Sequence, residues 1–63
     1  MSIGARIRQA RKAKGLTQEE LGKLLHVTGA AISHFERGRR DVDAKTLAKI
    51  ARVLEKPIDF FLE

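Results

Sequence analysis

The chain has 63 residues, of which 13 are lysine or arginine and 8 are aspartate or glutamate, so its formal net charge is +5. A chain of this length forms one domain and buries only about 60% of the surface that it exposes when unfolded, which excludes a deep catalytic cleft. It has no cysteine and two histidines. A disulfide or zinc scaffold is therefore excluded, and we expect neither a metal nor a cofactor.

The apolar runs are short and are interrupted by charged residues. None reaches the roughly 20 residues of a membrane span or the roughly 7 to 15 residues of a secretory signal core. We therefore expect a soluble, cytoplasmic protein with no membrane contact, and nothing in the pattern indicates a small-molecule site.

The positive charge is concentrated at the start of the chain. Residues 1–16 contain five basic residues and no acidic one, whereas residues 17–38 have a slight excess of acids and residues 39–63 a slight excess of bases. With a pI near 10.3, this distribution favours an anionic partner. The alternative is a solvated helix face on which lysine and arginine serve solubility alone.

The first predicted helix begins at Ser2 or Ile3 and ends at Lys14. Gly15 follows it in the position where a residue with positive φ often ends a helix. Leu16 comes next, and we expect it to fill part of the core. Three apolar residues at helical spacing mark the buried face of this helix: Ile3, Ile7 and Ala10.

The second predicted helix covers residues 18–25 and begins with a capping box. In this motif the Thr17 hydroxyl accepts a hydrogen bond from the Glu20 amide, and the Glu20 carboxylate accepts one from the Thr17 amide. The helical run stops at His26. Two apolar residues four apart give the buried face, Leu21 and Leu25.

The third predicted helix covers residues 29 to about 37, with Thr28 as its N-cap and Gly38 at its end. Ile32 and Phe35 are three residues apart and turn toward the second helix. Only a tight turn separates the two helices, so they must meet at a sharp angle. The opposite face of the third helix has short, uncharged residues: Thr28, Gly29, Ala30, Ser33 and His34.

Two more helices complete the pattern. Asp43 is a good N-cap for a fourth helix, whose apolar face is Leu47, Ile50, Ala51 and Leu54. Pro57 ends this pattern and, with its preset φ, opens a short fifth helix over residues 58–62. No β pattern, repeat or low-complexity stretch is present, so the sequence predicts an all-α fold, a compact five-helix bundle.

The predicted core draws on all five helices, but two apolar residues fit it poorly. Leu24 points about 80° from the mean direction of its apolar neighbours and should be about half exposed. Phe60 is next to Phe61 on a helix too short to bury both equally. Both residues are either packed at the core edge or part of a patch that joins two protomers. The predicted core is Ile7, Ala10, Leu16, Leu21, Leu25, Val27, Ile32, Phe35, Leu47, Ile50, Leu54, Ile58 and Phe61.

In its order of caps, apolar positions and turns, the chain resembles the helix-turn-helix family of phage repressors and Cro proteins, often called the XRE type. The resemblance runs from the first basic helix through LTQEEL at 16–21 and AISHFERG at 31–38 to IDFFL at 58–62. It implies that residues 1–63 form a single helix-turn-helix domain of the lambda repressor-like kind, with a recognition helix at about 29–37.

The resemblance also implies a function. It indicates a bacterial or phage-encoded transcriptional regulator, a repressor, that binds double-stranded DNA and is nucleoid-associated when bound. Members of the family are usually homodimers, so we expect a near-palindromic operator. Two half-sites would then be read by recognition helices about 34 Å apart. Candidate dimer surfaces are the loop at 39–43 and the end of the chain containing Phe60, Phe61 and Leu62.

The same resemblance assigns roles to individual positions. The residues presented to base edges in the major groove are Thr28, Gly29, Ala30, Ser33 and His34. The residues expected at DNA phosphates are Thr17, Gln18, Arg37, Arg39 and Arg40. A structural ion pair is expected to tie the first helix to the third, between Arg11 and Glu36.

The chain departs from the family pattern at a few positions. Gly22 stands where alanine is favoured, which permits a close helix approach but weakens the helix by roughly 1 kcal/mol. His26 stands where glycine is favoured, so a positive φ there would be unfavourable. Gly29 and Ala30 replace longer side chains that often read bases. We therefore expect much of the sequence preference to come from DNA shape or from the arginines.

Two other classes of function are weighed against DNA binding. One is a protein-interaction or antitoxin-type module that keeps the fold, uses Leu24 and Phe60, and binds DNA only secondarily. The other is an enzyme, which is disfavoured because Ser33 and His34 point about 100° apart on a helix and cannot form a nucleophile and base pair. The end of the sequence directly after the fifth helix suits either a minimal repressor or the DNA-binding end of a longer protein.

Overall fold

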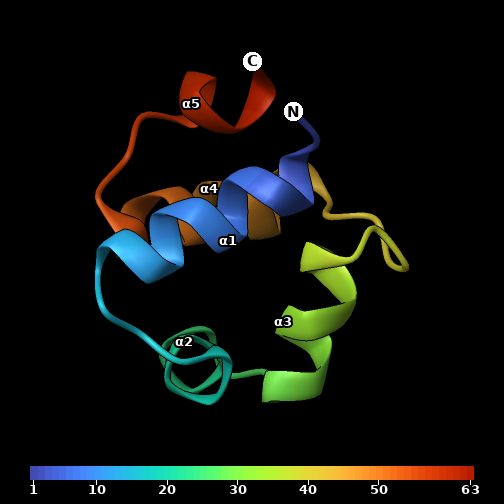
Figure 1. Cartoon of the computed structure of the whole chain (residues 1–63), viewed down its shortest axis with the longest axis vertical. Coiled ribbons are helices and arrows are strands. Elements are labelled where there is room, and N and C mark those ends of the chain that lie inside the picture. Colours follow the sequence, from blue (N-terminus) through green and yellow to red (C-terminus); the bar gives the residue numbers. More distant parts are fainter.

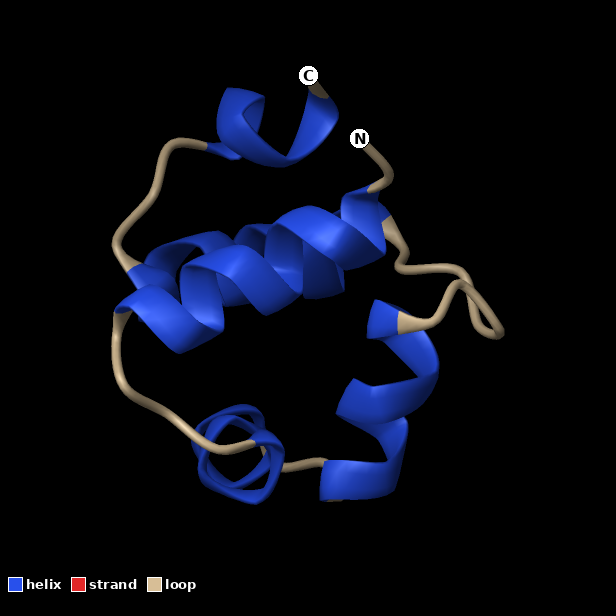
Figure 2. Ribbon diagram, in the orientation of Figure 1, coloured by secondary structure: helices blue, strands red, loops and turns tan.

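The computed structural model describes all 63 residues and contains five α-helices and no strand. In chain order they are α1 (Ile3–Ala13), α2 (Gln18–Leu25), α3 (Gly29–Glu36), α4 (Ala44–Leu54) and α5 (Ile58–Leu62) (Figures 1 and 2). α1 and α4 are in contact across the middle of the molecule, with α5 on one side and α2 and α3 on the other (Figure 1). The predicted five-helix, all-α fold is confirmed. No helix is long and apolar enough to cross a membrane.

The helix boundaries follow from the caps that the sequence supplies. The hydroxyls of Ser2, Thr17 and Thr28 each accept a hydrogen bond from the amide three residues further on. At the other ends, Gly15 and Gly38 have positive φ angles of 76° and 74°. α1 and α3 end one residue before the predicted limit, because the last predicted residue of each is the C-cap.

Two residues with side chains also end helices in the left-handed conformation. His26 ends α2 with φ of 60°, and Glu55 ends α4 with φ of 58°. This conformation is uncommon for residues other than glycine. Lys14 forms an ion pair with the Glu55 carboxylate, which links the C-terminal ends of α1 and α4.

The core consists of ten buried apolar residues, and all of them except Ala51 were predicted to lie there: Ile7, Ala10, Leu21, Ile32, Phe35, Leu47, Ile50, Ala51, Leu54 and Phe61. Leu16 and Leu25 are only partly buried and pack against this core from its edge.

The prediction was wrong for Val27 and Ile58, which are 38% and 41% exposed. Val27 belongs to the turn between α2 and α3, where its amide donates to the Gly22 carbonyl at 2.8 Å and its side chain stays outside. Ile58 is the first residue of α5 and belongs to an exposed run at 55–59.

The two residues that fitted the pattern poorly behave as expected. Leu24 is 53% exposed. Phe61 is fully buried, and Phe60 meets it edge to face with ring centroids 5.2 Å apart. The Phe60 ring is partly exposed and lies between two cations, the Arg6 guanidinium at 4.8 Å and the Lys56 ammonium at 5.2 Å from its centre. These contacts hold α5 against α1.

The backbones of α2 and of the following turn touch at Gly22. A β-carbon at this position would lie 2.7 Å from the Val27 carbonyl oxygen and 2.9 Å from the Thr28 carbonyl carbon. Both distances are shorter than van der Waals contact, so alanine would force the turn to shift. The missing side chain therefore sets how closely α3 follows α2.

The capping box makes α2 sensitive to acid. Hydrogen bonds from the Thr17 amide and hydroxyl hold the pKa of Glu20 below its ordinary value of 4.5. A carboxylate with a lowered pKa contributes stability above the ordinary value and loses it as the pH falls through the lowered one. Glu20→Gln keeps an acceptor for the Thr17 amide but does not titrate.

We therefore expect the melting temperature of the wild-type chain to fall further than that of the Glu20→Gln variant when the pH is lowered from neutral to below the ordinary glutamate pKa. Thermal unfolding followed by circular dichroism at the two pH values measures this difference. Equal losses in the two proteins would show that the capping carboxylate does not contribute to acid sensitivity.

Candidate nucleic-acid interface

α3 buries one face and presents the other to solvent. Ile32 and Phe35 are buried against the rest of the molecule. The five residues predicted to face bases lie on the other face or at the start of the helix, three of them exposed (Thr28, Ala30, His34) and two half-buried (Gly29, Ser33). This surface carries hydroxyl, methyl and imidazole groups and no acid, so it can approach an anionic polymer without charge repulsion.

The first turns of α2 and α3 lie against each other. A β-carbon on Gly29 would be 3.2 Å from both the backbone nitrogen and the Cα of Glu19, which explains why Gly29 is half-buried. Figure 1 shows α2 end-on, with α3 starting beside it. Helix N-termini carry a partial positive charge and unpaired amides, so two of them close together favour an anion.

Thr17 is already engaged at the start of α2. Its hydroxyl accepts from the Glu20 amide at 3.0 Å, and its amide donates to Glu20 Oε1 at 2.8 Å. The Thr17 hydroxyl also helps to lower the pKa of the Glu20 carboxylate, so a phosphate oxygen would compete with Glu20 for the hydroxyl proton.

A buried network joins α1, α2 and α3. Arg11 Nε donates to Glu36 Oε2 at 2.7 Å, and Arg11 Nη2 donates to Glu36 Oε1 at 3.1 Å. Arg11 Nη1 donates to the Leu16 carbonyl at 2.8 Å. The Arg11–Glu36 ion pair implied by the resemblance is therefore present. Its third member, Gln18, donates from Nε2 to Glu36 Oε1 at 3.1 Å, which ties the start of α2 to the end of α3.

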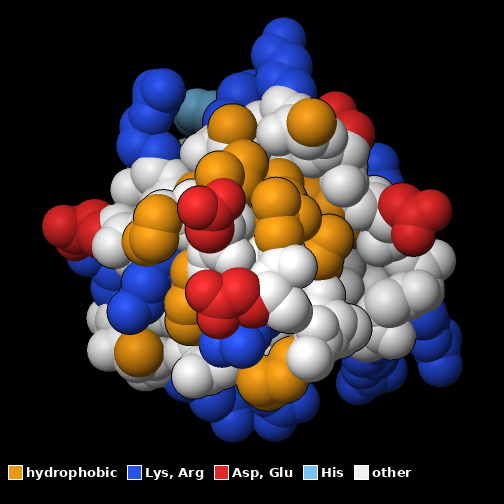
Figure 3. Space-filling view, turned by 90° about the horizontal axis from the view of Figure 1, so that it is seen from above, with side chains coloured by type: hydrophobic (Ala, Val, Ile, Leu, Met, Phe, Trp, Pro, Cys, Tyr) orange, Lys and Arg blue, Asp and Glu red, His pale blue; other side chains and the backbone are white.

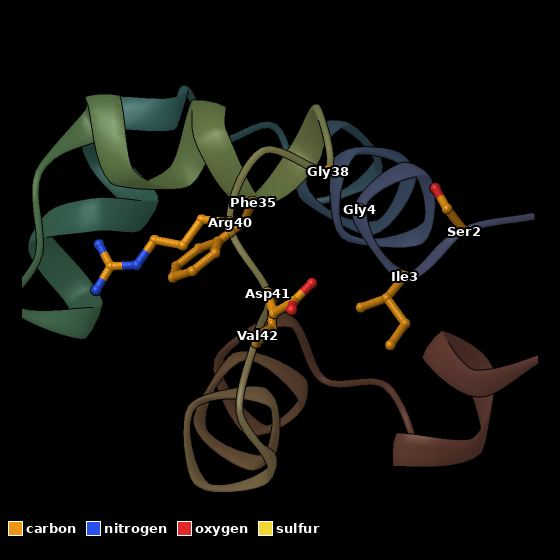
Figure 4. Close-up of a pocket in the computed structure, with 8 residues that line it drawn as sticks. All are labelled: Ser2, Ile3, Gly4, Phe35, Gly38, Arg40, Asp41 and Val42. Atoms are coloured by element: carbon orange, nitrogen blue, oxygen red, sulfur yellow. The ribbon is translucent and has the colours of Figure 1, made fainter.

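Three exposed arginines follow α3: Arg37, Arg39 and Arg40. None of them forms an ion pair. The Arg40 guanidinium lies 5.4 Å from the centre of the Phe35 ring, and its side chain extends along that ring away from Asp41 (Figure 4). No local sequence pattern indicates this contact, because it depends on how the loop folds back over the end of α3.

The same loop and the start of α1 enclose a shallow cavity of about 390 Å³ (Figure 4). Ile3 lies on one side of it and Phe35 on the other (Figure 4). Its lining contains no cluster of polar groups that converge on one point, and we assign it no ligand.

Two helices joined by a tight turn, with the second exposing an acid-free face, define a helix-turn-helix domain. The family model described as helix-turn-helix matches residues 7–61. The chain belongs to this family.

Its relatives are bacterial. An uncharacterized HTH-type transcriptional regulator of Sinorhizobium medicae is 39% identical over 61 residues, which cover 97% of this chain and 44% of the relative. The HTH-type transcriptional regulator ImmR of Bacillus subtilis is 36% identical over 62 residues, covering 98% of this chain and 49% of the relative. The chain thus spans about half the length of these curated relatives. Both are named as HTH-type transcriptional regulators.

Solved structures show the same fold. The P22 c2 repressor in complex with a synthetic operator has a TM-score of 0.88 and 31% identity, over 97% of this chain and 92% of that one. SinR, a master regulator for biofilm formation solved in complex with DNA, has a TM-score of 0.88 and 32% identity, over 97% of this chain and 98% of that one.

Removing Arg11 should destabilise the chain far more than removing its neighbour. Arg11 is 7% exposed and the Glu36 side chain 2%, so Arg11→Ala leaves a buried carboxylate without its cation and should lower the free energy of unfolding by about 3 kcal/mol or more. Lys12 is exposed and has no partner, so Lys12→Ala should change it by about 0.5 kcal/mol or less. Urea unfolding of both variants measures the difference, and equal free energies of unfolding would refute the prediction.

Proposed function

We propose that the chain is the sequence-specific DNA-binding domain of a transcriptional regulator, and that it represses by placing α3 in the major groove of its operator. The observation that carries this proposal is the exposed, acid-free face of α3, flanked by the first turn of α2 and by the arginines at 37, 39 and 40. The similarity to DNA-bound P22 c2 repressor and SinR supports it. Since the relatives are bacterial, we place the protein in the cytoplasm, associated with the nucleoid when bound.

Base reading would rest on short side chains. The Thr28 and Ser33 hydroxyls can donate or accept, and the Ala30 methyl can contact a thymine methyl. His34 is exposed and is the longest polar side chain on this face. None of these matches a bidentate arginine–guanine contact, worth about 1 to 3 kcal/mol, so DNA shape should carry part of the preference.

Phosphate contacts would supply most of the affinity. One Nε2 hydrogen of Gln18 is bound to Glu36, and the other is free to donate to a phosphate oxygen. Thr17 lies beside it at the start of α2. Arg37 and Arg39 are exposed and unpaired, and stacking on the Phe35 ring leaves the Arg40 charge available. Such contacts attract any DNA sequence and weaken as salt rises.

Selection of bound duplexes from a random pool, carried out at two salt concentrations, tests this function. We expect an enriched near-palindromic motif and an affinity that falls as salt is raised. His34→Ala should relax the motif at one position in each half-site. Arg39→Gln should weaken binding to all sequences and reduce the salt slope by about 1.

Arg52→Gln serves as the matched control, because Arg52 is an exposed arginine on α4 outside the proposed interface. It should leave both the motif and the salt slope unchanged. The absence of any enriched motif, together with an affinity insensitive to salt, would refute the proposed function.

We further propose that the chain binds DNA as a homodimer through the face that carries α5. Figure 3 shows hydrophobic side chains gathered on this face. The exposed ones are Met1 at 73%, Leu62 at 59% and Ile58 at 41%. Phe61 was predicted to lie in the core as well as at this end of the chain; it is fully buried and cannot take part in the contact.

Leu62→Glu should weaken self-association, because it places a charge in this apolar contact. We expect a shift toward monomer in analytical ultracentrifugation and a loss of affinity for a two-half-site duplex, with affinity for a single half-site unchanged. Leu24→Glu is the control, since Leu24 is similarly exposed, at 53%, but lies on α2. An unchanged sedimentation profile for Leu62→Glu would exclude this interface.

A further inference from the structure

A second hollow in the surface of the molecule lies apart from α3 and α5. The groove lies between the C-terminal end of α2 and the C-terminal half of α4, and its volume is about 250 Å³. Its residues are Leu24, Leu25, His26, Lys49, Arg52 and Val53. Leu24 is 53% exposed, while Leu25 and Val53 are half-buried beneath it, so the floor is aliphatic and open to water.

The rim of the groove carries uncompensated positive charge. Lys49 and Arg52 are three residues apart on α4, and both are exposed. Neither forms an ion pair, and α4 contains no acidic residue that could neutralise them. Residues three apart on a helix are neighbours on its surface, so these like charges repel each other.

We propose that this groove binds an acidic peptide segment of another protein. A leucine-sized side chain of the peptide packs between Leu24 and Val53, and its carboxylates lie against Lys49 and Arg52. The apolar floor gives the contact its burial, and the charged rim selects acidic over basic peptides.

Duplex DNA fits this groove less well. Phosphates would use the cations of the rim, but a phosphate backbone has no apolar group to cover Leu24 and Val53, which would stay in contact with water or with charge. No groove residue is among those proposed to contact DNA. The proposed peptide site and the proposed DNA interface therefore share no residue.

Selection of random peptides displayed on phage against the immobilised full chain tests the proposal. We expect enrichment of peptides that combine several acids with one or two large aliphatic residues, and binding that weakens as salt is raised. Leu24→Ser should weaken the selected peptides about tenfold or more. The double variant Lys49→Glu, Arg52→Glu should abolish their binding and leaves the apolar floor unchanged.

Leu62→Ser is the matched control, because it removes a similarly exposed leucine from α5 and should leave peptide affinity unchanged. Three results would each overturn the proposal: no acidic enrichment, peptide affinities unaffected by Leu24→Ser, or displacement of the peptides by duplex DNA. The peptide selection uses no DNA. A failure to enrich peptides would therefore leave the proposed DNA-binding function intact, and a loss of DNA binding would leave the proposed peptide site intact.

Discussion

The buried contact between Arg11 and Glu36 is the constraint on which the arrangement of the first three helices depends. Taking two charges out of water is unfavourable by several kcal/mol per ion, so such a pair persists only when its hydrogen bonds are satisfied. Here Glu36 receives three of them, from Arg11 twice and from Gln18 once, and the third Arg11 nitrogen, Nη1, donates to the Leu16 carbonyl. A planar guanidinium fork accepts a carboxylate in few orientations. We infer that the pair fixes the angle of α3 to α1 and also the position of the Gln18 amide.

The close backbone contact between α2 and α3 affects which side chains could read DNA bases in the proposed function. Gly29 lies with its Cα against the first turn of α2, where a β-carbon would be 3.2 Å from Glu19. A long base-reading side chain at this position would start from a crowded point. The junction of α2 and α3 is therefore tight at this position. In the proposed function, the tight junction leaves base discrimination to the other residues of this face and to the following arginines, so we expect direct readout to be modest.

The helix boundaries could be predicted because capping is local: Thr17 and Thr28 lie within three residues of the amides they bind. The helical spacing of apolar residues predicted most of the core but failed at Val27. Val27 lies in a turn, where helical spacing does not tell whether a side chain points toward the core or toward solvent. The Arg11–Glu36 pair spans 25 residues and was available only through the resemblance. The stacking of Arg40 on Phe35 and the groove beside Leu24 depend on packing between elements, and no local pattern carries that information.

Leu24 and Leu62 are similarly exposed, but the charges around them differ. This difference favours a different kind of partner for each. Near Leu62 both signs of charge are present: Glu63 lies 3.6 Å from Arg6, and Asp59 is exposed on the same helix. In a two-fold contact each residue near the axis meets its own copy or a close neighbour of it, so a face with balanced charges can pack against itself. Near Leu24 the charges of Lys49 and Arg52 are unpaired, and a second copy would bring like charges together. The α5 face therefore suits another molecule of this chain, and the α2–α4 groove suits an acidic partner.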